Sequence, residues 1–363
     1  MSKSPTATLQ RKGGRWPRFR LLIFIGIVLC LGAGGYILFQ QANRDRSPCP
    51  RPLTVTPPLQ YPVPVILDTD FAEDVDDVGA LAILHAMADK GQAEILGVMI
   101  SSGNRFAPRA VDTINTYYGR PDIPVGVAWE PVVSPESRYT FELAFDFPND
   151  IVGVPEAVDL YREILAQQPN GSVTIVSVGF LTNLRALLRS ESDAHSVLNG
   201  SDLVAAKVRQ LVVMGGHYPD SSQHPAGKEY NFALDSVATY DVIPDWPTPI
   251  IFVGFEAGVD VVTGVPLQTD TPEDNPVRRA YWLFNRGAGR SSWDLITVYV
   301  AVQGSSELWA ICPGGYNEVS ANGSNRWIDS PQGNHGFLVQ LGAREQIEKL
   351  LNDLLIQPPR LVE

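Results

Sequence analysis

Short, almost uninterrupted apolar runs recur along this chain, separated by segments in which apolar residues return every three or four positions. The apolar runs cover residues 63–67, 94–101, 173–179, 210–216 and 249–255. The helically spaced segments cover residues 76–89, 108–118, 155–168, 181–189 and 235–243. Strands that do not alternate apolar and polar residues are typical of parallel sheets buried on both faces. The pattern therefore predicts one α/β domain over residues 63–363, an open and mostly parallel sheet with helices on both faces.

A separate apolar segment precedes this domain. Residues 21–39 carry no charge, and 19 residues in a helix nearly span a hydrocarbon core of about 30 Å. Six basic residues precede the segment, namely Lys3, Arg11, Lys12, Arg15, Arg18 and Arg20. This charge bias predicts a cytoplasmic N-terminus over residues 1–20, one transmembrane helix over 21–39 and a domain outside the cytoplasm. The alternative is a signal peptide cleaved near the small residues 33–35, which also exports the domain.

The proline-rich stretch 40–62 is predicted to be a tether between this segment and the domain. Charge also divides the chain near this stretch. Residues 1–51 hold nine basic residues and one acidic residue, whereas the rest holds 19 basic and 39 acidic residues. A body this acidic is a poor match for nucleic acid and suits a metal ion or a neutral or cationic small ligand.

The three cysteines, Cys30, Cys49 and Cys312, form no C-x-x-C pair. Their number and spacing exclude a zinc knuckle and a dense disulfide framework. Outside the cytoplasm Cys49 and Cys312 could pair, and the alternative is two unpaired thiols.

The most distinctive segment follows the first apolar run, where six carboxylates lie within ten residues. They are Asp68, Asp70, Glu73, Asp74, Asp76 and Asp77. Asp68 and Asp70 leave an extended segment on the same side, and Asp76 and Asp77 open the next helix, so they can converge on one point. Carboxylates this close repel one another, and a hard divalent ion such as Ca²⁺ would relieve the repulsion. The alternative is a solvated acidic loop that caps the helix.

At this point the sequence resembles the inosine-uridine-preferring nucleoside hydrolase family, whose members carry D-x-D-P-G-x-D-D after the first strand. Here the corresponding segment is two residues longer and lacks the Pro-Gly. The other family blocks are matched, in order, by Ser101-Ser102-Gly103-Asn104, Gly179-Phe180-Leu181-Thr182-Asn183, Val213-Met214-Gly215-Gly216, Glu229-Tyr230-Asn231 with Asp235, and Ser292-Trp293-Asp294. The resemblance implies a Rossmann-like sheet, a Ca²⁺ ion and hydrolysis of the N-ribosidic bond of ribonucleosides.

Residue roles also follow from the resemblance. It implies that Asp70 binds Ca²⁺ and takes the proton from the attacking water. Further calcium ligands would be Asp77, Asp294 and the backbone carbonyl of Thr182, with Asp68 as a supporting carboxylate. The implied ribose-binding residues are Asp76, Asn104, Glu229 and Asn231, with Met214 lining the ribose pocket. Fixed carboxylates suit this reaction because the departing base leaves positive charge on the sugar.

The leaving base is less well defined by the sequence. Some family members have a histidine just before the last metal-binding aspartate, and this chain has Trp293 there. An indole cannot act as an acid but can stack on a base, which favours a purine preference. Trp293 as a core aromatic is the alternative, and His217 is either a second candidate acid or a surface-loop histidine. His85 is predicted to pack in the core.

Two other classes of function stay open at this stage. A phosphatase of the haloacid dehalogenase type also places D-x-D after a first strand, although no separate Ser/Thr and Lys blocks are evident here. A non-catalytic nucleoside- or ribose-binding domain is compatible with the altered acidic loop. The sequence does not fix the oligomeric state, and a homo-oligomer is compatible with it.

Overall fold

The computed structural model of the chain describes residue 49 and residues 61–130, 133–219 and 228–360. The predictions for residues 1–20, for the apolar segment 21–39 and for most of the tether 40–62 lie outside these residues. Within the part that is described, no helix is long and apolar enough to cross a bilayer. The description below concerns the unit Cys49–Glu363.

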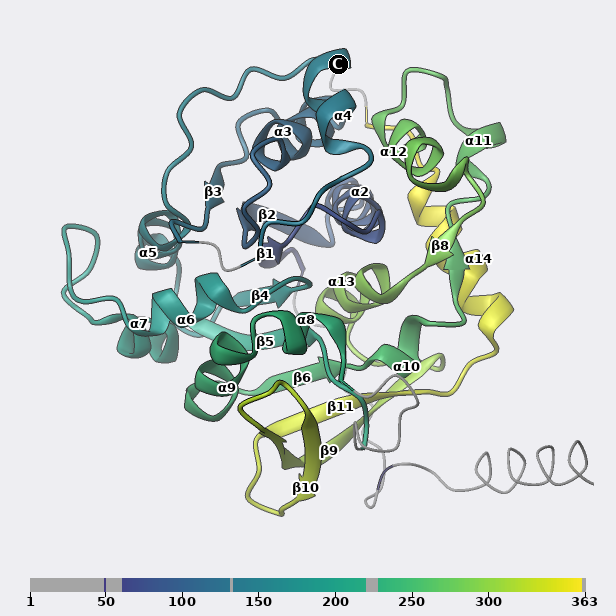
Figure 1. Cartoon of the computed structure of the whole chain (residues 1–363). Coiled ribbons are helices and arrows are strands. Elements are labelled where there is room, and N and C mark those ends of the chain that lie inside the picture. Colours follow the sequence, from purple (N-terminus) through teal and green to yellow (C-terminus); the bar gives the residue numbers. More distant parts are fainter. Residues whose placement is uncertain (1–48, 50–60, 131–132, 220–227, 361–363) are drawn as a thin grey trace, which may run out of the picture. The chain divides into compact units, whose positions relative to one another are not determined.

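A nine-stranded sheet forms the centre of this unit (Figure 1). Its strands are β1 (Val63–Thr69), β2 (Ala93–Ile100), β3 (Val125–Val127), β4 (Val173–Ser177), β5 (Val208–Met214), β6 (Ile250–Val253), β9 (Trp309–Val319), β10 (Asn325–Asp329) and β11 (His335–Gln340). They lie in the order β10-β9-β11-β6-β5-β4-β1-β2-β3. The seven strands from β11 to β3 pair in parallel, and β9 and β10 extend the sheet by antiparallel pairing. A small second sheet joins β7 (Val262–Thr263) to β8 (Arg290–Ser291).

Helices cover both faces of the large sheet. They are α2 (Asp76–Asp89), α3 (Ala107–Tyr117), α4 (Thr140–Asp146), α5 (Ala157–Gln167), α6 (Thr182–Leu188), α7 (Gly200–Lys207), α8 (Tyr230–Leu234), α9 (Ser236–Asp245), α10 (Phe255–Gly258), α11 (Leu267–Asp270), α12 (Pro276–Asn285), α13 (Trp293–Gln303) and α14 (Arg344–Leu355). The side chains of successive residues in β1 point to opposite faces of the large sheet. Val65 and Leu67 pack with α2, α3, α13 and α14, whereas Ile66 packs with α5, α6, α7 and α9.

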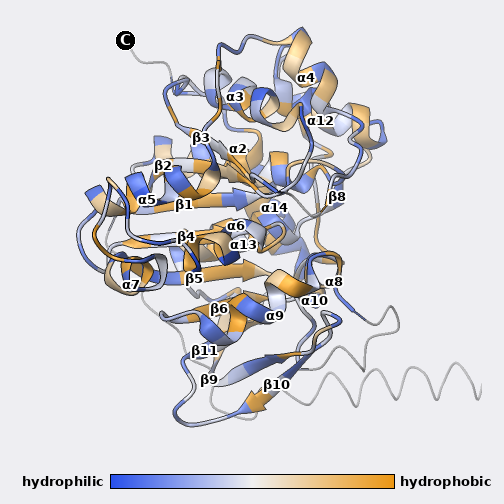
Figure 2. Ribbon diagram, turned by 60° about the vertical axis from the view of Figure 1, so that its left-hand side comes forward, coloured by the Kyte–Doolittle hydropathy of each residue, from blue (hydrophilic) through white to orange (hydrophobic). Residues whose placement is uncertain are grey.

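The apolar runs therefore become central strands with both faces buried, as predicted. In Figure 2, strand β5 is mostly hydrophobic in colour, and its last four residues are all buried. The predicted mostly parallel α/β sheet with helices on both faces is confirmed. The antiparallel strands β9 and β10 were not predicted from the sequence.

A disulfide joins Cys49 to Cys312 in β9, with the two Cα atoms 5.4 Å apart. Of the two alternatives left open by the sequence, the structure contains the paired form. The bond fastens a residue of the predicted tether to the sheet, across 263 positions of sequence.

Candidate active site

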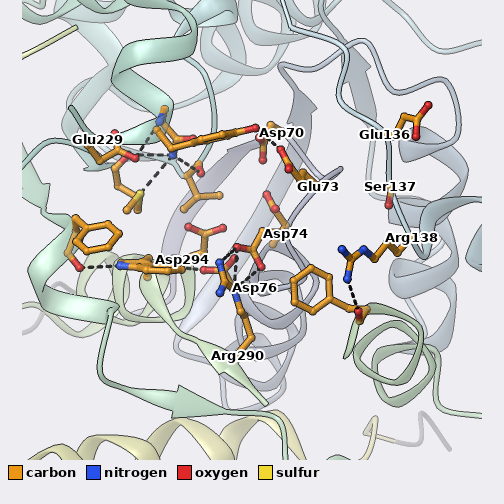
Figure 3. Close-up of a pocket in the computed structure, with 18 residues that line it drawn as sticks. Asp70, Glu73, Asp74, Asp76, Glu136, Ser137, Arg138, Glu229, Arg290 and Asp294 are labelled. Atoms are coloured by element: carbon orange, nitrogen blue, oxygen red, sulfur yellow. Dashed lines mark hydrogen bonds and ion pairs between the residues drawn. The ribbon is translucent and has the colours of Figure 1, made fainter. Parts of the chain in front are cut away.

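The strand order reverses direction beside β1. The chain passes from β1 to β2 and β3 on one side, and returns through β4 to the other side. In open α/β sheets this switch point, at the carboxyl ends of the strands, is where ligands bind. A cavity of about 550 Å³ lies there (Figure 3). Its lining comes from the loop after β1, from the ends of β4 and β5, and from α8, α10, α12 and the start of α13.

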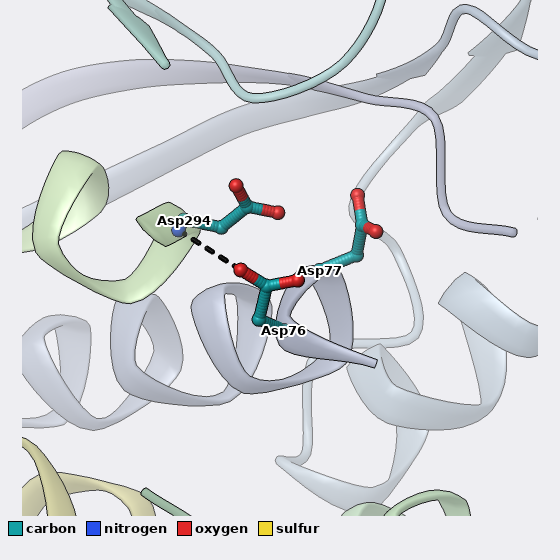
Figure 4. A group of neighbouring side chains, drawn as sticks. All are labelled: Asp76, Asp77 and Asp294. Atoms are coloured by element: carbon teal, nitrogen blue, oxygen red, sulfur yellow. Dashed lines mark hydrogen bonds between the residues drawn. The ribbon is translucent and has the colours of Figure 1, made fainter. Parts of the chain in front are cut away.

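Three buried aspartates form a cluster in this cavity (Figure 4). Asp76 and Asp77 open α2, and Asp294 lies in the first turn of α13. One carboxylate oxygen from each lies within 4.8 Å of the others. The backbone N–H of Asp294 donates to the Asp76 carboxylate over 3.2 Å. The N-termini of α2 and α13 thus bring acidic side chains together in the cavity. The dipoles of these helices favour negative charge at that position.

Asp70 lines the same cavity beside this cluster. It follows β1 directly, and the next residue, Phe71, has a φ of 38°. This left-handed conformation turns the chain sharply away from the strand. The turn is held by Asp77, because its carboxylate accepts from the Phe71 N–H at 3.2 Å and from the Thr69 hydroxyl. Asp70, Asp77 and Asp294 therefore meet in one cavity, as the sequence predicted.

The cluster fits a hard divalent cation. Burial, followed by repulsion from neighbouring carboxylates, raises the pKa of Asp76 and Asp294 well above the ordinary value. Burial raises the pKa of Asp70 to about 7. The guanidinium of Arg290 bonds to Asp74, the loop carboxylate, at 2.5 Å. A bound cation would oppose these pKa shifts, and an all-oxygen ligand set suits Ca²⁺ or Mg²⁺.

Glu229 and Asn231 form a second polar group on the cavity wall, at the start of α8. The Glu229 carboxylate accepts backbone N–H groups from Gly216 at 3.2 Å and Asn231 at 2.9 Å. The Asn231 amide donates to the carbonyl of Val178 at 3.1 Å and contacts the sulfur of Met214 at 3.3 Å. The four side chains predicted from the last blocks, Met214, Glu229, Asn231 and Trp293, therefore all line the cavity.

Another part of the lining is aromatic. The indole N–H of Trp293 donates to the carbonyl of Phe255 at 2.7 Å, and the two rings lie 5.3 Å apart at 34°. The guanidinium of Arg290 lies 5.0 Å from the Trp293 ring centroid. Trp293 is thus a partly buried wall residue whose tilt is fixed by its neighbours.

Two contacts join the loop after β1 to other elements at the cavity. The Tyr230 hydroxyl donates to the Glu73 carboxylate, and Arg290 donates to the Asp74 carboxylate from Nε at 2.9 Å. Glu73 and Asp74 occupy the segment that is longer than the family motif. Glu136, Ser137, Arg138 and Phe284 complete this part of the lining. The sequence pattern gave no signal for these four residues or for Phe255 and Arg290, because each comes from a loop or element terminus outside the quoted motifs.

Three predicted site residues do not line the cavity. Asp68 is buried behind it and accepts from Tyr161 at 2.9 Å and Asn183 at 3.2 Å. The Thr182 hydroxyl donates to Asp235 at 2.6 Å, while Val178, four residues earlier, lines the cavity instead.

Asn104 is the third of these residues. Its side chain accepts from the Phe106 N–H at 3.0 Å and the Thr140 hydroxyl at 3.3 Å, so it links the loop before α3 to the start of α4. The two histidines considered above also lie outside the lining. His217 is buried, 4.0 Å from Glu256, and His85 is packed in the core as predicted.

The fold and the site together define an α/β protein with a carboxylate-rich, metal-compatible cavity at its topological switch point. The chain belongs to the inosine-uridine preferring nucleoside hydrolase family, whose model matches residues 65–313. A pyrimidine-specific ribonucleoside hydrolase, RihA of Klebsiella pneumoniae, is 28% identical over 206 residues, which cover 53% of this chain and 60% of that protein. The chain thus spans less than two thirds of the length of this curated relative.

Solved structures share the fold at low sequence identity. A plant nucleoside hydrolase aligns with a TM-score of 0.58 at 22% identity, over 82% of this chain and 100% of its own. The purine-preferring ribonucleoside hydrolase of Gardnerella vaginalis aligns with a TM-score of 0.60 at 15% identity, over 80% of this chain and 98% of its own. The match extends over almost the whole of each solved chain, so the fold of the domain is that of these proteins.

Proposed function

We propose that this protein hydrolyses the N-glycosidic bond of ribonucleosides to ribose and free base, with water activated by Asp70 and with Ca²⁺ as cofactor. The observation that supports this most directly is the meeting of Asp70, Asp76, Asp77 and Asp294 in one cavity at the switch point. Family membership supports the same reaction class. No contact in the described residues favours a phosphatase over this reaction.

In the proposed reaction, Asp70 accepts a proton from the water that attacks the anomeric carbon. Asp76, Asp77, Asp294 and Asp70 would hold the metal ion, which when bound lowers the pKa of water and orients it. The remaining carboxylates stabilise the positive charge that develops on the ribose as the base leaves. Asn231 and Glu229 line the same cavity, which supports a role in binding the ribose hydroxyls, and burial of these polar groups would disfavour deoxyribose.

The test is a panel of purine and pyrimidine ribosides given to the full-length protein, with release of reducing sugar as the readout and calcium varied. We expect turnover that is lost in excess chelator and restored by Ca²⁺. Full activity in chelator would contradict the metal requirement. Saturable binding of ribosides without any turnover would instead identify a binding domain.

Asp70→Asn tests the proposed base with almost no change in side-chain shape. We expect kcat to fall by about 10²–10⁴-fold, because general-base catalysis contributes about that much. Melting temperature and calcium binding serve as controls for folding and for the metal site. Activity near that of the wild type would remove Asp70 from this role.

The base specificity is a further part of the proposal. Trp293 and Phe255 offer aromatic surface at the cavity wall, which supports stacking on the base and favours a purine preference. The Klebsiella relative is a pyrimidine-specific enzyme, but at 28% identity its specificity does not carry over to this protein.

We also propose that the domain is exported, either anchored by residues 21–39 or released by cleavage. The disulfide between Cys49 and Cys312 supports this, since disulfides persist mainly in oxidising compartments. Fractionation of cells expressing the full chain, with sequencing of the mature N-terminus, separates the two forms. Recovery of the whole protein in the cytosol would contradict export.

A further inference from the structure

The lining of the cavity carries many more acidic groups than basic groups. Its lining contains eight carboxylates and two guanidinium groups. The acidic residues are Asp70, Glu73, Asp74, Asp76, Asp77, Glu136, Glu229 and Asp294. Even with a divalent cation at the aspartate cluster, negative groups remain in excess. A cavity walled by one sign of charge raises the local concentration of ligands of the opposite sign.

Two of these carboxylates are exposed and belong neither to the aspartate cluster nor to an ion pair among the described residues. Glu73 is exposed and accepts the Tyr230 hydroxyl, which leaves its charge uncompensated. Glu136 is also exposed and has no ion-pair partner among the described residues. Figure 3 shows Glu136 on the segment that faces Glu229 across the cavity. By contrast, Asp74 is neutralised by Arg290.

Among the described residues, carboxyl groups and the Tyr230 hydroxyl are the only acids that the lining offers to a leaving base. It contains no histidine, lysine or cysteine within the residues that the structure describes. Trp293 is not an acid, and its N–H is bonded to the Phe255 carbonyl. The Tyr230 hydroxyl already donates to Glu73, and burial followed by this carboxylate raises the tyrosine pKa well above its ordinary value.

We propose that the preferred substrates are ribosides whose base carries a permanent positive charge, such as N-ribosylpyridinium ions or N7-alkylated purine ribosides. This inference rests on the proposed function and names its substrate class. Glu73 and Glu136 attract the cationic base, and the aromatic wall of Phe255 and Trp293 gives it a π-face to rest on.

The chemistry of these substrates explains how hydrolysis proceeds with the described groups alone. The water oxygen forms a bond to the anomeric carbon and gives one proton to Asp70. The electron pair of the C–N bond passes to the ring nitrogen system and cancels its positive charge. The base therefore leaves neutral without being protonated, and Asp70 releases the proton to solvent. A neutral purine or pyrimidine would leave as an anion unless an acid protonated it.

The experiment uses two matched substrate pairs with the full-length protein in calcium buffer: inosine with 7-methylinosine, and uridine with N-ribosylnicotinamide. We expect kcat/KM to be at least tenfold higher for the cationic member of each pair, after correction for the uncatalysed rates. We also expect the rate for cationic ribosides to hold on the alkaline side, because no acid group must stay protonated. Equal corrected values for both members would overturn the inference.

Binding separates recognition from the greater reactivity of cationic ribosides. In the Asp70→Asn protein we expect 7-methylinosine to bind about tenfold more tightly than inosine, by calorimetry. Glu73→Gln combined with Glu136→Gln should remove this preference, whereas Glu163→Gln, an exposed carboxylate on α5, should keep it. A preference that survives the double substitution would contradict the role of Glu73 and Glu136.

The remaining outcomes are also distinguishable. If no riboside of either kind is cleaved, the proposed function itself fails. If inosine and uridine are cleaved as well as the cationic ribosides and His224→Ala abolishes only the neutral reactions, a histidine outside the described residues supplies the acid. That result would overturn the preference for cationic bases and leave the hydrolase proposal intact.

Discussion

At the scale of single residues, Trp293 is an aromatic side chain of the cavity wall that two neighbours hold in place. Its N–H is committed to the Phe255 carbonyl, and the guanidinium of Arg290 lies 5.0 Å from its ring centroid. The hydrogen bond holds the indole at one tilt, so a base that enters the cavity meets an oriented aromatic surface. In the proposed reaction the ring would act on the base by contact, without proton transfer.

Trp293→Ala tests this contact. We expect kcat/KM to fall about tenfold for purine ribosides and less for pyrimidine ribosides, because base–aromatic stacking contributes about 1–3 kcal/mol and grows with ring area. Trp293→Phe is the matched control, since it keeps an aromatic face and loses the hydrogen bond. Equal losses for both kinds of riboside in Trp293→Ala would rule out stacking as the source of preference.

The sequence predicted which aspartates lie near one another, but it did not predict which side chains enclose each of them. Asp68 and Asp70 are two positions apart and leave β1 on the same side, so the pattern treats them alike. They differ because Tyr161 and Asn183, far away in the sequence, enclose Asp68, whereas Asp70 opens into the cavity. The family resemblance assigns Asp76 to ribose binding, and the structure places its carboxylate beside those of Asp77 and Asp294.

At the scale of elements, the turn between β4 and α6 lies against the end of β1. Gly179 occupies this turn, and a Cβ atom there would lie 2.4 Å from the backbone nitrogen of Asp70. A Cβ would also lie 2.9 Å from the Ser101 hydroxyl. These distances are too short for real contacts, so the absence of a side chain at Gly179 allows β4 and the loop after β1 to approach.

Gly179→Ala should therefore displace Asp70 more than it unfolds the domain. We expect kcat to fall about 10–100-fold, since a shift of about 1 Å at a catalytic group costs up to about 10²-fold. Circular dichroism and melting temperature should show a folded protein. A variant with the kcat of the wild type would mean that the position of Asp70 tolerates this shift.

Helices α2 and α3 are linked by a buried histidine. Nε2 of His85 lies 2.9 Å from Oδ1 of Asn115, and its ring stacks on Tyr118 at 4.8 Å. Nδ1 faces the Arg120 guanidinium at 3.4 Å, an arrangement that suits a neutral imidazole. Burial, the largest cause, lowers the pKa of His85 to about 3.

This pKa predicts a loss of stability in mild acid. Below pH 6.5 His85 is protonated in the unfolded chain, whereas in the folded protein it stays neutral down to about pH 3. The free energy of unfolding therefore decreases as the pH falls through this range. Between pH 6.5 and 5 the contribution is about 2 kcal/mol. Urea unfolding at several pH values should show a smaller pH slope for His85→Gln than for the wild type. Replacing the exposed His195 by Gln should leave the slope unchanged, and an unaltered slope in His85→Gln would contradict burial of a neutral histidine.

Some helices and strands could be predicted from the sequence, and others could not. Helix α2 was predicted over residues 76–89, which are its bounds in the structure. Strands β9 and β10 were missed because burial alternates in β10 and in the second half of β9, and because β9 includes Pro313, Gly314 and Gly315, which are typical of turns. The pairing of β9 with β11 is a long-range contact that no local pattern encodes, and β10 joins the sheet only through β9.

At the scale of the whole molecule, Cys49 shows that the folded unit begins before the first strand. The unit runs from Cys49 to Glu363, and the disulfide anchors its first residue to β9. Both sulfur-bearing side chains are buried within the same apolar core as Ile66 and Phe337. A soluble version that starts at residue 52 would therefore lose this link.

Loss of the disulfide should destabilise the entire domain, because the bond closes a loop that spans nearly all of the sheet and restricts the unfolded chain. We expect Cys49→Ser to lower the free energy of unfolding by about 2–4 kcal/mol. The wild type should lose the same amount on reduction, and Cys49→Ser should not respond further to reductant. Cys30→Ser is the matched control and should behave like the wild type in both conditions. If reduction left the wild-type melting temperature unchanged, the link between Cys49 and β9 would not contribute to the stability of the fold.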